Sequence, residues 1–344
     1  MQLDSTPSNP NVLPDPQALG GTTAGEAFHE DRRRRRPLPA DVLNRLTTLN
    51  DTRAWVSVFV TVAMLCVTIM VAVWYWSPWL IVPALVLITS RQQACFVLAH
   101  DAAHYRLFRR RALNEWVGRA LGTIVGVSMC SYRVVHRLHH NDLYGETDPD
   151  LPLHGGYPRG KAYLLKKLTR DLLGQTAPKT YAYFFGAPAA LRPLDDTSPR
   201  LRREARNDRW VVVAFHLIAP CLAFAAGYGV QYLVLWVLPL VTTLQALLRF
   251  RAILEHGAVT DLSSPLTAAR TNLGPLWLMG LVFPHYVHYH IEHHLYPAIP
   301  HYNLPECHAE LDRLGLLGDA QVCRVSEAAR MVFAPRQGVD HDFG

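Results

Sequence analysis

Two long stretches of this chain of 344 residues contain no charged side chain. Residues 55–90 and residues 210–248 hold no Lys, Arg, Asp or Glu, and the stretches are 36 and 39 residues long. A helix needs about 20 apolar residues to cross the hydrocarbon core of a bilayer, so each stretch is long enough for two crossings. Ser77-Pro78 interrupts the first stretch and Gly227-Tyr228-Gly229 interrupts the second, as is typical of tight turns. The sequence therefore predicts an all-α integral membrane protein in which four transmembrane helices form two hairpins.

The segments outside these stretches have other compositions. Residues 1–40 are basic and rich in Pro, Gly, Ser and Thr, which is typical of a disordered tail. Residues 40–50 are amphipathic and are expected on the membrane surface, and residues 112–130 are expected to form an interfacial or re-entrant helix. We place the spans at about 55–76, 79–99, 209–228 and 231–249, the membrane domain at 41–310 and a cytoplasmic C-terminal tail at 311–344.

The positive charges predict the orientation of the spans. All 34 Lys and Arg residues lie outside the two uncharged stretches, and a run of arginines, Arg32 to Arg36, precedes the first stretch. By the positive-inside rule, the N-terminus, the middle segment and the C-terminus face the cytoplasm. An arginine run can also mark a nucleic-acid partner, but beside a membrane hairpin it is typical of an anchor for anionic headgroups. We therefore expect no nucleic-acid partner, and a location in the cytoplasmic membrane if the source is bacterial.

Three short clusters of histidine carry the strongest chemical signal. The first has the pattern HxxxH and the others have the pattern HxxHH: His100 and His104; His136, His139 and His140; His290, His293 and His294. Histidines three or four residues apart lie one helical turn apart, so their imidazoles can point to one side. Eight such ligands are too many for one zinc ion, which usually takes four, and they suit two metal ions side by side. Chance spacing among 17 histidines is the alternative, and the repeat of HxxHH argues against it.

The order and spacing of these clusters resemble the membrane fatty acid desaturase and hydroxylase superfamily. The resemblance covers roughly residues 55–310 and includes the phrases LAHDAAHYRLF, HRLHHNDLYGETDPDLP, LEHG and YHIEHHLYPAIPHYNLP. It implies a di-iron centre at the cytoplasmic face of four transmembrane helices. It also implies that dioxygen and two electrons are used to remove hydrogens from a long hydrocarbon chain, or to hydroxylate it. Residue chemistry agrees, because imidazole is a suitable ligand for iron.

Carried over by position, the resemblance implies a set of iron ligands. The set contains the eight histidines of the three clusters and His256 of the LEHG phrase as a ninth, although a histidine at the membrane surface is the alternative for His256. Asn272 is a weaker candidate for contact with a metal or a water molecule, and His285 and His288 are weaker candidate ligands beside the third cluster.

Carboxylates near the clusters are expected to support the ligands. A ligating histidine usually donates its other ring N–H to a carboxylate or carbonyl, which fixes its orientation. The candidates are Asp101, Asp148, Asp150, Glu255 and Glu292, and Asp148 and Asp150 can equally be helix caps. Within the third span, His216 is expected to be neutral and hydrogen-bonded to a neighbouring helix. The other histidines are expected on the surface or in ordinary packing: His29, His154, His301, His308 and His341.

Details of the clusters indicate which branch of the superfamily the chain resembles. The first cluster is HxxxH and not the HxxxxH of the acyl-CoA Δ9 branch, and His290 stands where front-end desaturases usually have Gln. No HPGG heme-binding phrase occurs, so electrons are expected from a separate ferredoxin or cytochrome b5 with its reductase. These features favour an acyl-lipid desaturase. A hydroxylase and a carotenoid ketolase or hydroxylase remain open. The alternative of another class is a non-catalytic metal transporter or sensor that binds zinc through histidine. A transporter is disfavoured because nearly all histidines lie outside the spans.

Overall fold

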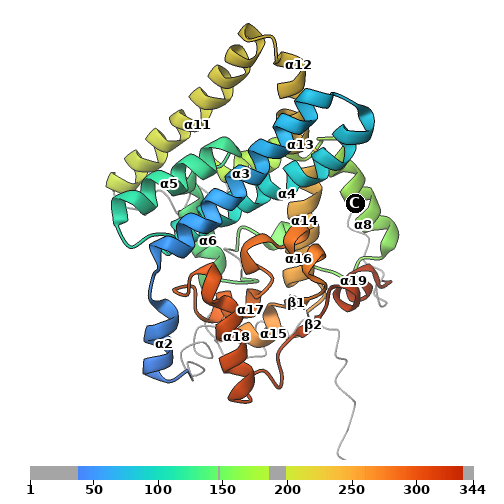
Figure 1. Cartoon of the computed structure of the whole chain (residues 1–344). Coiled ribbons are helices and arrows are strands. Elements are labelled where there is room, and N and C mark those ends of the chain that lie inside the picture. The colour runs from blue at the N-terminus through green and yellow to red at the C-terminus, as the bar shows by residue number, and fades with distance from the viewer. Residues whose placement is uncertain (1–37, 146–147, 186–198, 260, 263, 336–344) are drawn as a thin grey trace, which may run out of the picture.

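The structure is a computed structural model, and it describes residues 38–145, 148–185, 199–259, 261–262 and 264–335. Helices form nearly all of its regular structure (Figure 1). In this described part, two short strands, β1 (Thr271–Leu273) and β2 (Val322–Arg324), pair in parallel and are the exception to the all-α prediction. Most of the expected N-terminal tail lies outside the described residues, as do His29 and His341.

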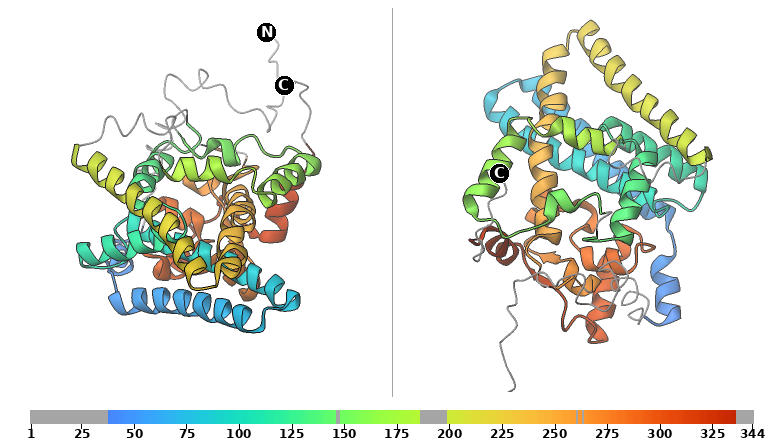
Figure 2. Two further views of the ribbon diagram at one scale, coloured as in Figure 1. Left: turned by 90° about the horizontal axis from the view of Figure 1, so that it is seen from above. Right: turned by 180° about the vertical axis from the view of Figure 1, so that it is seen from behind.

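Four segments are long and apolar enough to cross a membrane, as the sequence predicts. They are α3 (Asp51–Tyr75), α4 (Pro78–Ala103), α11 (Pro199–Ala225) and Gly229–His256, which contains α12 (Gly229–Tyr232), η1 (Leu233–Val237), α13 (Leu238–Val241) and α14 (Thr243–His256). The breaks fall at the two predicted turns. Pro78 begins α4, where its missing N–H has no cost, and Gly227 adopts a left-handed φ of 79°. From this second turn, α11 and the fourth segment diverge (Figures 1 and 2).

The central helix of the structure is α4. It packs against α3 and against α5 (Arg111–Ile124), and all its residues from Ile88 to Ala103 are buried. Three polar side chains in this stretch donate to backbone carbonyls of other segments: Arg91 to Gly280 (2.5 Å), Gln92 to Trp236 (3.1 Å) and Gln93 to Val282 (2.6 Å). Because a buried polar group is costly without a partner, these bonds fix α4 to the segments around it.

The fourth segment is not one regular helix. A turn of π-helix, η1, occurs within it, and Thr242 has φ −126° and ψ −87° between α13 and α14. The carbonyl of Leu240 near this break accepts hydrogen bonds from Gln245 (2.6 Å) and from the hydroxyl of Tyr181 (3.0 Å). A broken helix is tolerated in a membrane where its freed backbone groups find new partners, as these two side chains provide here. The sequence predicts an unbroken span here because a π-turn does not alter an apolar pattern.

The remaining helices complete the domain. They are α2 (Ala40–Thr47), α6 (Met129–Asn141), α7 (Leu151–His154), α8 (Lys161–Leu172), α9 (Ala177–Phe184), α15 (Pro265–Ala268), α16 (Leu276–Val282), η2 (Pro284–Tyr286), α17 (His290–Leu295), η3 (His301–Asn303), α18 (Leu304–Arg313) and α19 (Val325–Phe333).

Two of these elements differ from the sequence prediction. The apolar side of α2 is covered by protein and not by lipid, because Val42 and Leu46 are buried in one cluster with Ile291 of α17. An amphipathic pattern does not reveal which apolar partner covers it. At the other end, β2 pairs with β1, and α19 packs against α14. Beyond residue 310 the chain therefore continues in regular structure that packs against the preceding elements as far as Phe333.

Gly118 allows three helices to approach closely beside the first two histidine clusters. A methyl group at Gly118 of α5 would overlap Ala102 Cβ of α4 and Met129 Sδ of α6. We expect Gly118→Ala to lower the free energy of unfolding by about 1–3 kcal/mol, as overpacking of a core typically does. Thermal unfolding in detergent is the measurement. Gly280→Ala is the matched control, because nothing lies within 4 Å of a methyl group there; equal stability of the two variants would contradict the prediction.

Candidate metal centre

Four segments bring the histidine clusters together. The first cluster lies at the end of α4, the second occupies the last turns of α6, and the third occupies α17. His256 is the last residue of α14. Ser128 begins α6 by accepting a hydrogen bond from the backbone N–H of Ser131, a helix cap that stabilises the start of this helix.

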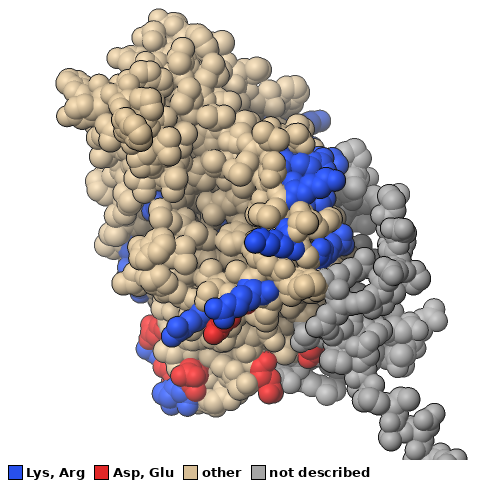
Figure 3. All heavy atoms as spheres, turned by 90° about the vertical axis from the view of Figure 1, so that its right-hand side faces the viewer, with Lys and Arg blue, Asp and Glu red and all other residues tan. Residues whose placement is uncertain are grey.

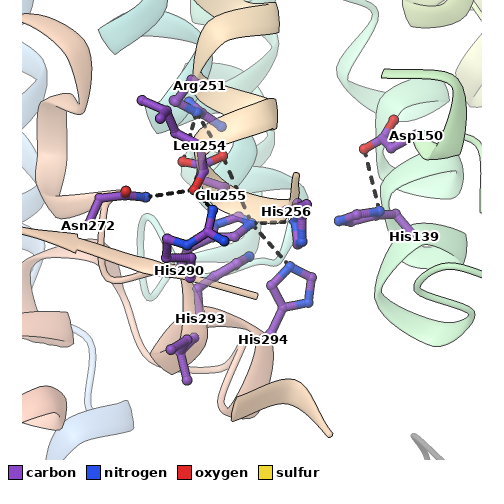
Figure 4. A network of polar contacts seen from close by, with 12 residues as sticks. His139, Asp150, Arg251, Leu254, Glu255, His256, Asn272, His290, His293 and His294 are labelled. Atoms are coloured by element: carbon purple, nitrogen blue, oxygen red, sulfur yellow. Dashed lines mark hydrogen bonds and ion pairs between the residues drawn. The ribbon is translucent and has the colours of Figure 1, made fainter. Parts of the chain in front are cut away.

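The nine predicted ligands form two groups whose ligand atoms lie within 4.8 Å of one another. The first group is His100, His104, His136, His140 and His293, and the second group is His139, His256, His290 and His294. Eight of the nine are buried, and His104 is partly buried. Figure 4 shows His256, His290 and His294 converging, with His139 facing them from α6.

Each HxxHH cluster is divided between the two groups. On a helix, residues i and i+4 are about 40° apart, whereas i+3 lies on the other side of i. His136 and His140 therefore enter the first group while His139 enters the second. In the third cluster the assignment is reversed, because His293 alone joins the first group. The expectation that each cluster points to one side is correct only for its i and i+4 members.

Distances between ring nitrogens fit a shared ion in each group. In the first group, Nε2 of His136 lies 2.8 Å from Nε2 of His100 and 3.0 Å from Nε2 of His140. In the second group, Nε2 of His290 lies 2.8 Å from Nε2 of His256 and 3.2 Å from Nε2 of His294. Two nitrogens bound at right angles to one ion, with bonds of about 2.0–2.1 Å, are about 2.9 Å apart. The donor atoms thus have the spacing that a transition-metal ion requires.

The neutral state of most of these histidines also favours metal binding. Burial, and after it the charge of neighbouring histidines, lowers the pKa well below 6.5 for His104, His136, His140, His290, His293 and His294. These imidazoles are neutral at neutral pH, as ligands must be. His139 differs: burial alone would lower its pKa, but the carboxylates of Asp148 and Asp150 raise it to about 9.

Metal binding to the second group is expected to depend on pH because of His139. Below its pKa of about 9, His139 of the metal-free protein carries a proton that must leave before Nε2 binds an ion. Each pH unit below 9 should therefore weaken binding in this group about tenfold. Binding in the first group should change little above neutral pH, since burial lowers the pKa of its histidines and keeps them neutral. Titration of metal-free protein with Co²⁺ between pH 6.5 and 9.5 tests this; equal pH dependence in the two groups would contradict it.

Asp148 supports His139 as the sequence suggests. Its Oδ1 accepts a hydrogen bond from Nδ1 of His139 (2.9 Å), which leaves Nε2 free for the second group. Asp148 also accepts from the backbone N–H groups of Tyr144 and Asp150 (2.9 Å each), so its carboxylate is fixed. Asp150 lies 3.6 Å from the same ring nitrogen of His139, and its side chain makes no capping hydrogen bond to α7.

Asp101 has the corresponding place beside the first group. Its Oδ1 lies 3.6 Å from Nδ1 of His100. Its Oδ2 accepts hydrogen bonds from the backbone N–H (3.0 Å) and from Nδ1 (2.6 Å) of His301.

Glu255 and Asn272 lie beside the second group (Figure 4). Glu255 pairs with Arg251 (3.0 Å), and its Oε2 is 3.9 Å from Nε2 of His290. The Asn272 side chain donates to the carbonyl of Leu254 (3.2 Å), and its buried Oδ1 has no hydrogen-bond partner. Asn272 therefore offers a buried oxygen beside the second group.

Glu292 is not in contact with a ligand, although it lies inside the third cluster. Its carboxylate accepts hydrogen bonds from the hydroxyl of Thr271 (2.6 Å) and from Nδ1 of His308 (2.5 Å). Glu292 therefore links α17 to β1 and α18. These hydrogen bonds go to residues outside the two groups, so they do not show Glu292 supporting a ligand.

Three histidines that the sequence assigns to the surface or to ordinary packing contact these carboxylates. His154 is buried, with Nε2 3.4 Å from Asp148 Oδ2, and His301 and His308 bond Asp101 and Glu292. Only His301 lies within a motif phrase, so local spacing gives no signal for the others. His285 and His288 lie outside both groups. His216 is bonded to the carbonyl of Thr123 (2.9 Å), as predicted.

Comparison with known proteins indicates the family of the chain. A family model described as fatty acid desaturase matches residues 76–321. Dihydrorhizobitoxine desaturase of Bradyrhizobium elkanii is 26% identical over 249 residues (70% of this chain, 67% of that protein). A probable fatty acid desaturase of Sorghum bicolor is 28% identical (62% and 58%), and a chloroplastic omega-3 fatty acid desaturase of Glycine max is 27% identical (62% and 50%). The chain thus spans between half and two thirds of the length of these relatives.

Proposed function

The chain belongs to the fatty acid desaturase family, and we propose that it is a di-iron membrane oxidoreductase that introduces a double bond into the acyl chain of a lipid. The observation that carries this proposal is the pair of converging histidine groups, five and four residues in size. In the proposed reaction the acyl chain of the substrate loses two hydrogens. Together with two electrons and two protons from outside, these hydrogens reduce O2 to two molecules of water.

The two groups would each hold one iron. Bound iron would supply the oxygen chemistry that removes hydrogen from an unactivated methylene, which amino-acid side chains cannot do. The protein's part is to position the ligands and to exclude bulk water. Asp148 orients His139 from outside the second group, and the burial of eight of the nine histidines keeps the site apart from solvent.

We propose that the histidine groups face the cytoplasm. Figure 3 shows one face of the molecule, whose upper part carries no charged residue, while Lys and Arg gather below it. Exposed tryptophans fit the two boundaries of a bilayer, where this residue is enriched. Trp74 and Trp79 flank the turn between α3 and α4, and Trp116 and Trp277 lie on α5 and α16. The positive-inside rule then assigns the charged side to the cytoplasm.

An acyl-lipid substrate is proposed because the site lies at the end of helices that can cross a membrane. The electrons are proposed to come from a separate ferredoxin or cytochrome b5 with its reductase. Dihydrorhizobitoxine desaturase provides a second candidate, because this relative is named for a substrate other than a fatty acid. Hydroxylation, or reaction with a carotenoid, would use the same ligand frame.

Mass spectrometry of lipids from a host that expresses the chain tests the proposal. We expect acyl chains two mass units lighter than in the same host expressing the His139→Ala variant. A gain of sixteen units would indicate a hydroxylase, and a change confined to pigments would indicate a carotenoid enzyme. No change in lipids or pigments, with the protein present in the membrane, would contradict desaturation of an acyl lipid and favour the second candidate.

A further inference from the structure

We propose that His301 is a positioning residue for the first histidine group: it holds Asp101 so that the carboxylate faces Nδ1 of His100 and directs Nε2 of His100 to the metal. This inference rests on the proposed di-iron function, and it concerns a residue outside the three clusters. His301 belongs to η3, which begins six residues after α17 ends.

The contacts between His301 and Asp101 are short and buried. Asp101 Oδ2 accepts from the backbone N–H of His301 at 3.0 Å and from its Nδ1 at 2.6 Å. Only 2% of His301 and 6% of Asp101 are exposed, so water does not compete for these bonds. Two donors on one oxygen fix the rotation of the carboxylate and leave Oδ1 on the side of His100.

The ring of His100 has one nitrogen facing the group and one facing Asp101. Its Nε2 lies 2.8 Å from Nε2 of His136 in the first group. Its Nδ1 is buried, makes no hydrogen bond, and lies 3.6 Å from Asp101 Oδ1. A small rotation of His100 on binding a metal would bring this N–H within bonding distance of Asp101. The carboxylate is thus the acceptor available to fix the tautomer of His100.

Ser57 completes the chain of contacts from the first span. Nδ1 of His301 faces the carboxylate of Asp101, and its other ring nitrogen, Nε2, lies 2.8 Å from the hydroxyl of Ser57. Ser57 belongs to α3, His301 to η3 and Asp101 to α4. Ser57, His301 and Asp101 therefore form a continuous row of side-chain contacts that ends beside His100.

The second group has its own support and is not expected to depend on His301. There Asp148 bonds His139, and His154 lies 3.4 Å from the same carboxylate. A change at His301 should therefore weaken the binding of one of the two metal ions. A general loss of folding would weaken the binding of both ions.

Binding of Co²⁺ to metal-free protein in detergent tests the inference, with affinity and visible absorption measured for each ion. His104→Ala and His256→Ala identify the signals of the first and second groups. We expect His301→Leu to lower the affinity for the ion in the first group about 10–100-fold, as loss of a ligand's outer partner typically does. We also expect it to alter the absorption spectrum of that ion. The second ion should be unchanged. His301→Asn should recover much of the affinity, because its amide can donate to Asp101, and His308→Leu should leave both ions unchanged.

Unchanged affinity and spectrum of the first ion in His301→Leu would overturn the inference, as would equal weakening of both ions. If His301→Leu does not fold, Ser57→Ala decides: a weaker effect confined to the first ion supports the inference, and no effect on either ion overturns it. Failure of the wild-type protein to bind two ions would instead refute the proposed di-iron function, and the role of His301 with it.

Discussion

Replacing His293 with alanine is expected to abolish the formation of unsaturated product and to remove metal from the first group. His293 is the one residue of the third cluster in this group, and its Nε2 lies 3.0 Å from Nε2 of His140. Loss of an outer partner of a ligand typically costs about 10–100-fold in affinity or activity, so loss of the ligand itself should cost at least about 100-fold. Iron content by mass spectrometry and product formation are the measurements.

A matched histidine outside the groups separates this effect from general damage. His216→Ala removes one hydrogen bond to the carbonyl of Thr123 in the span region and touches neither group. We expect this variant to retain iron, whereas His293→Ala should lose it while still inserting in the membrane. Full iron content and full activity in His293→Ala would refute its assignment as a ligand.

Replacing Asp148 with asparagine is expected to have the second largest effect, and the effect should change with pH. The carboxylate of Asp148 orients His139 by accepting a hydrogen bond from Nδ1 of His139. Loss of this carboxylate should lower the affinity for the ion in the second group by about 10–100-fold. The same carboxylate also raises the pKa of His139. In Asp148→Asn this pKa falls, so at neutral pH a proton competes less with the metal. The loss of affinity should therefore be largest near pH 9.5 and smaller near pH 7.

Proton release gives a direct measurement of this second prediction. The wild-type protein should release one proton from His139 when the second ion binds at pH 7–8, and Asp148→Asn should release fewer. Calorimetry in buffers of different ionisation enthalpy measures the difference. Equal proton release by the two proteins, with equal affinity at pH 9.5, would contradict the role assigned to Asp148.

The sequence predicts the spans and the histidine clusters because both depend on local patterns. An uncharged stretch of 36 or 39 residues needs no knowledge of the fold to be recognised, and HxxHH places ligands on adjacent turns wherever the helix lies. The division of each cluster between two groups follows from helical geometry, but it also requires that α6 and α17 face each other. Only the folded structure supplies that relation.

The supporting residues are less accessible to sequence analysis. His301 contacts Asp101, from which it is separated by 200 residues in the sequence, and His308 of α18 contacts Glu292 of α17. A single histidine without a repeat has no distinguishing pattern, so it is assigned to the surface. The same limit applies to α2, whose amphipathic pattern fits lipid and protein equally well, and whose buried residues Val42 and Leu46 contact protein.

The metal content of the purified protein, measured together with its consumption of O2, is the most direct test of the central claim. We predict two irons per chain and lipid-dependent O2 uptake when reductant is supplied, with both lost in His293→Ala. One zinc per chain, with no O2 uptake in the presence of lipid and reductant, would contradict the proposal that the two histidine groups form a di-iron oxidation site.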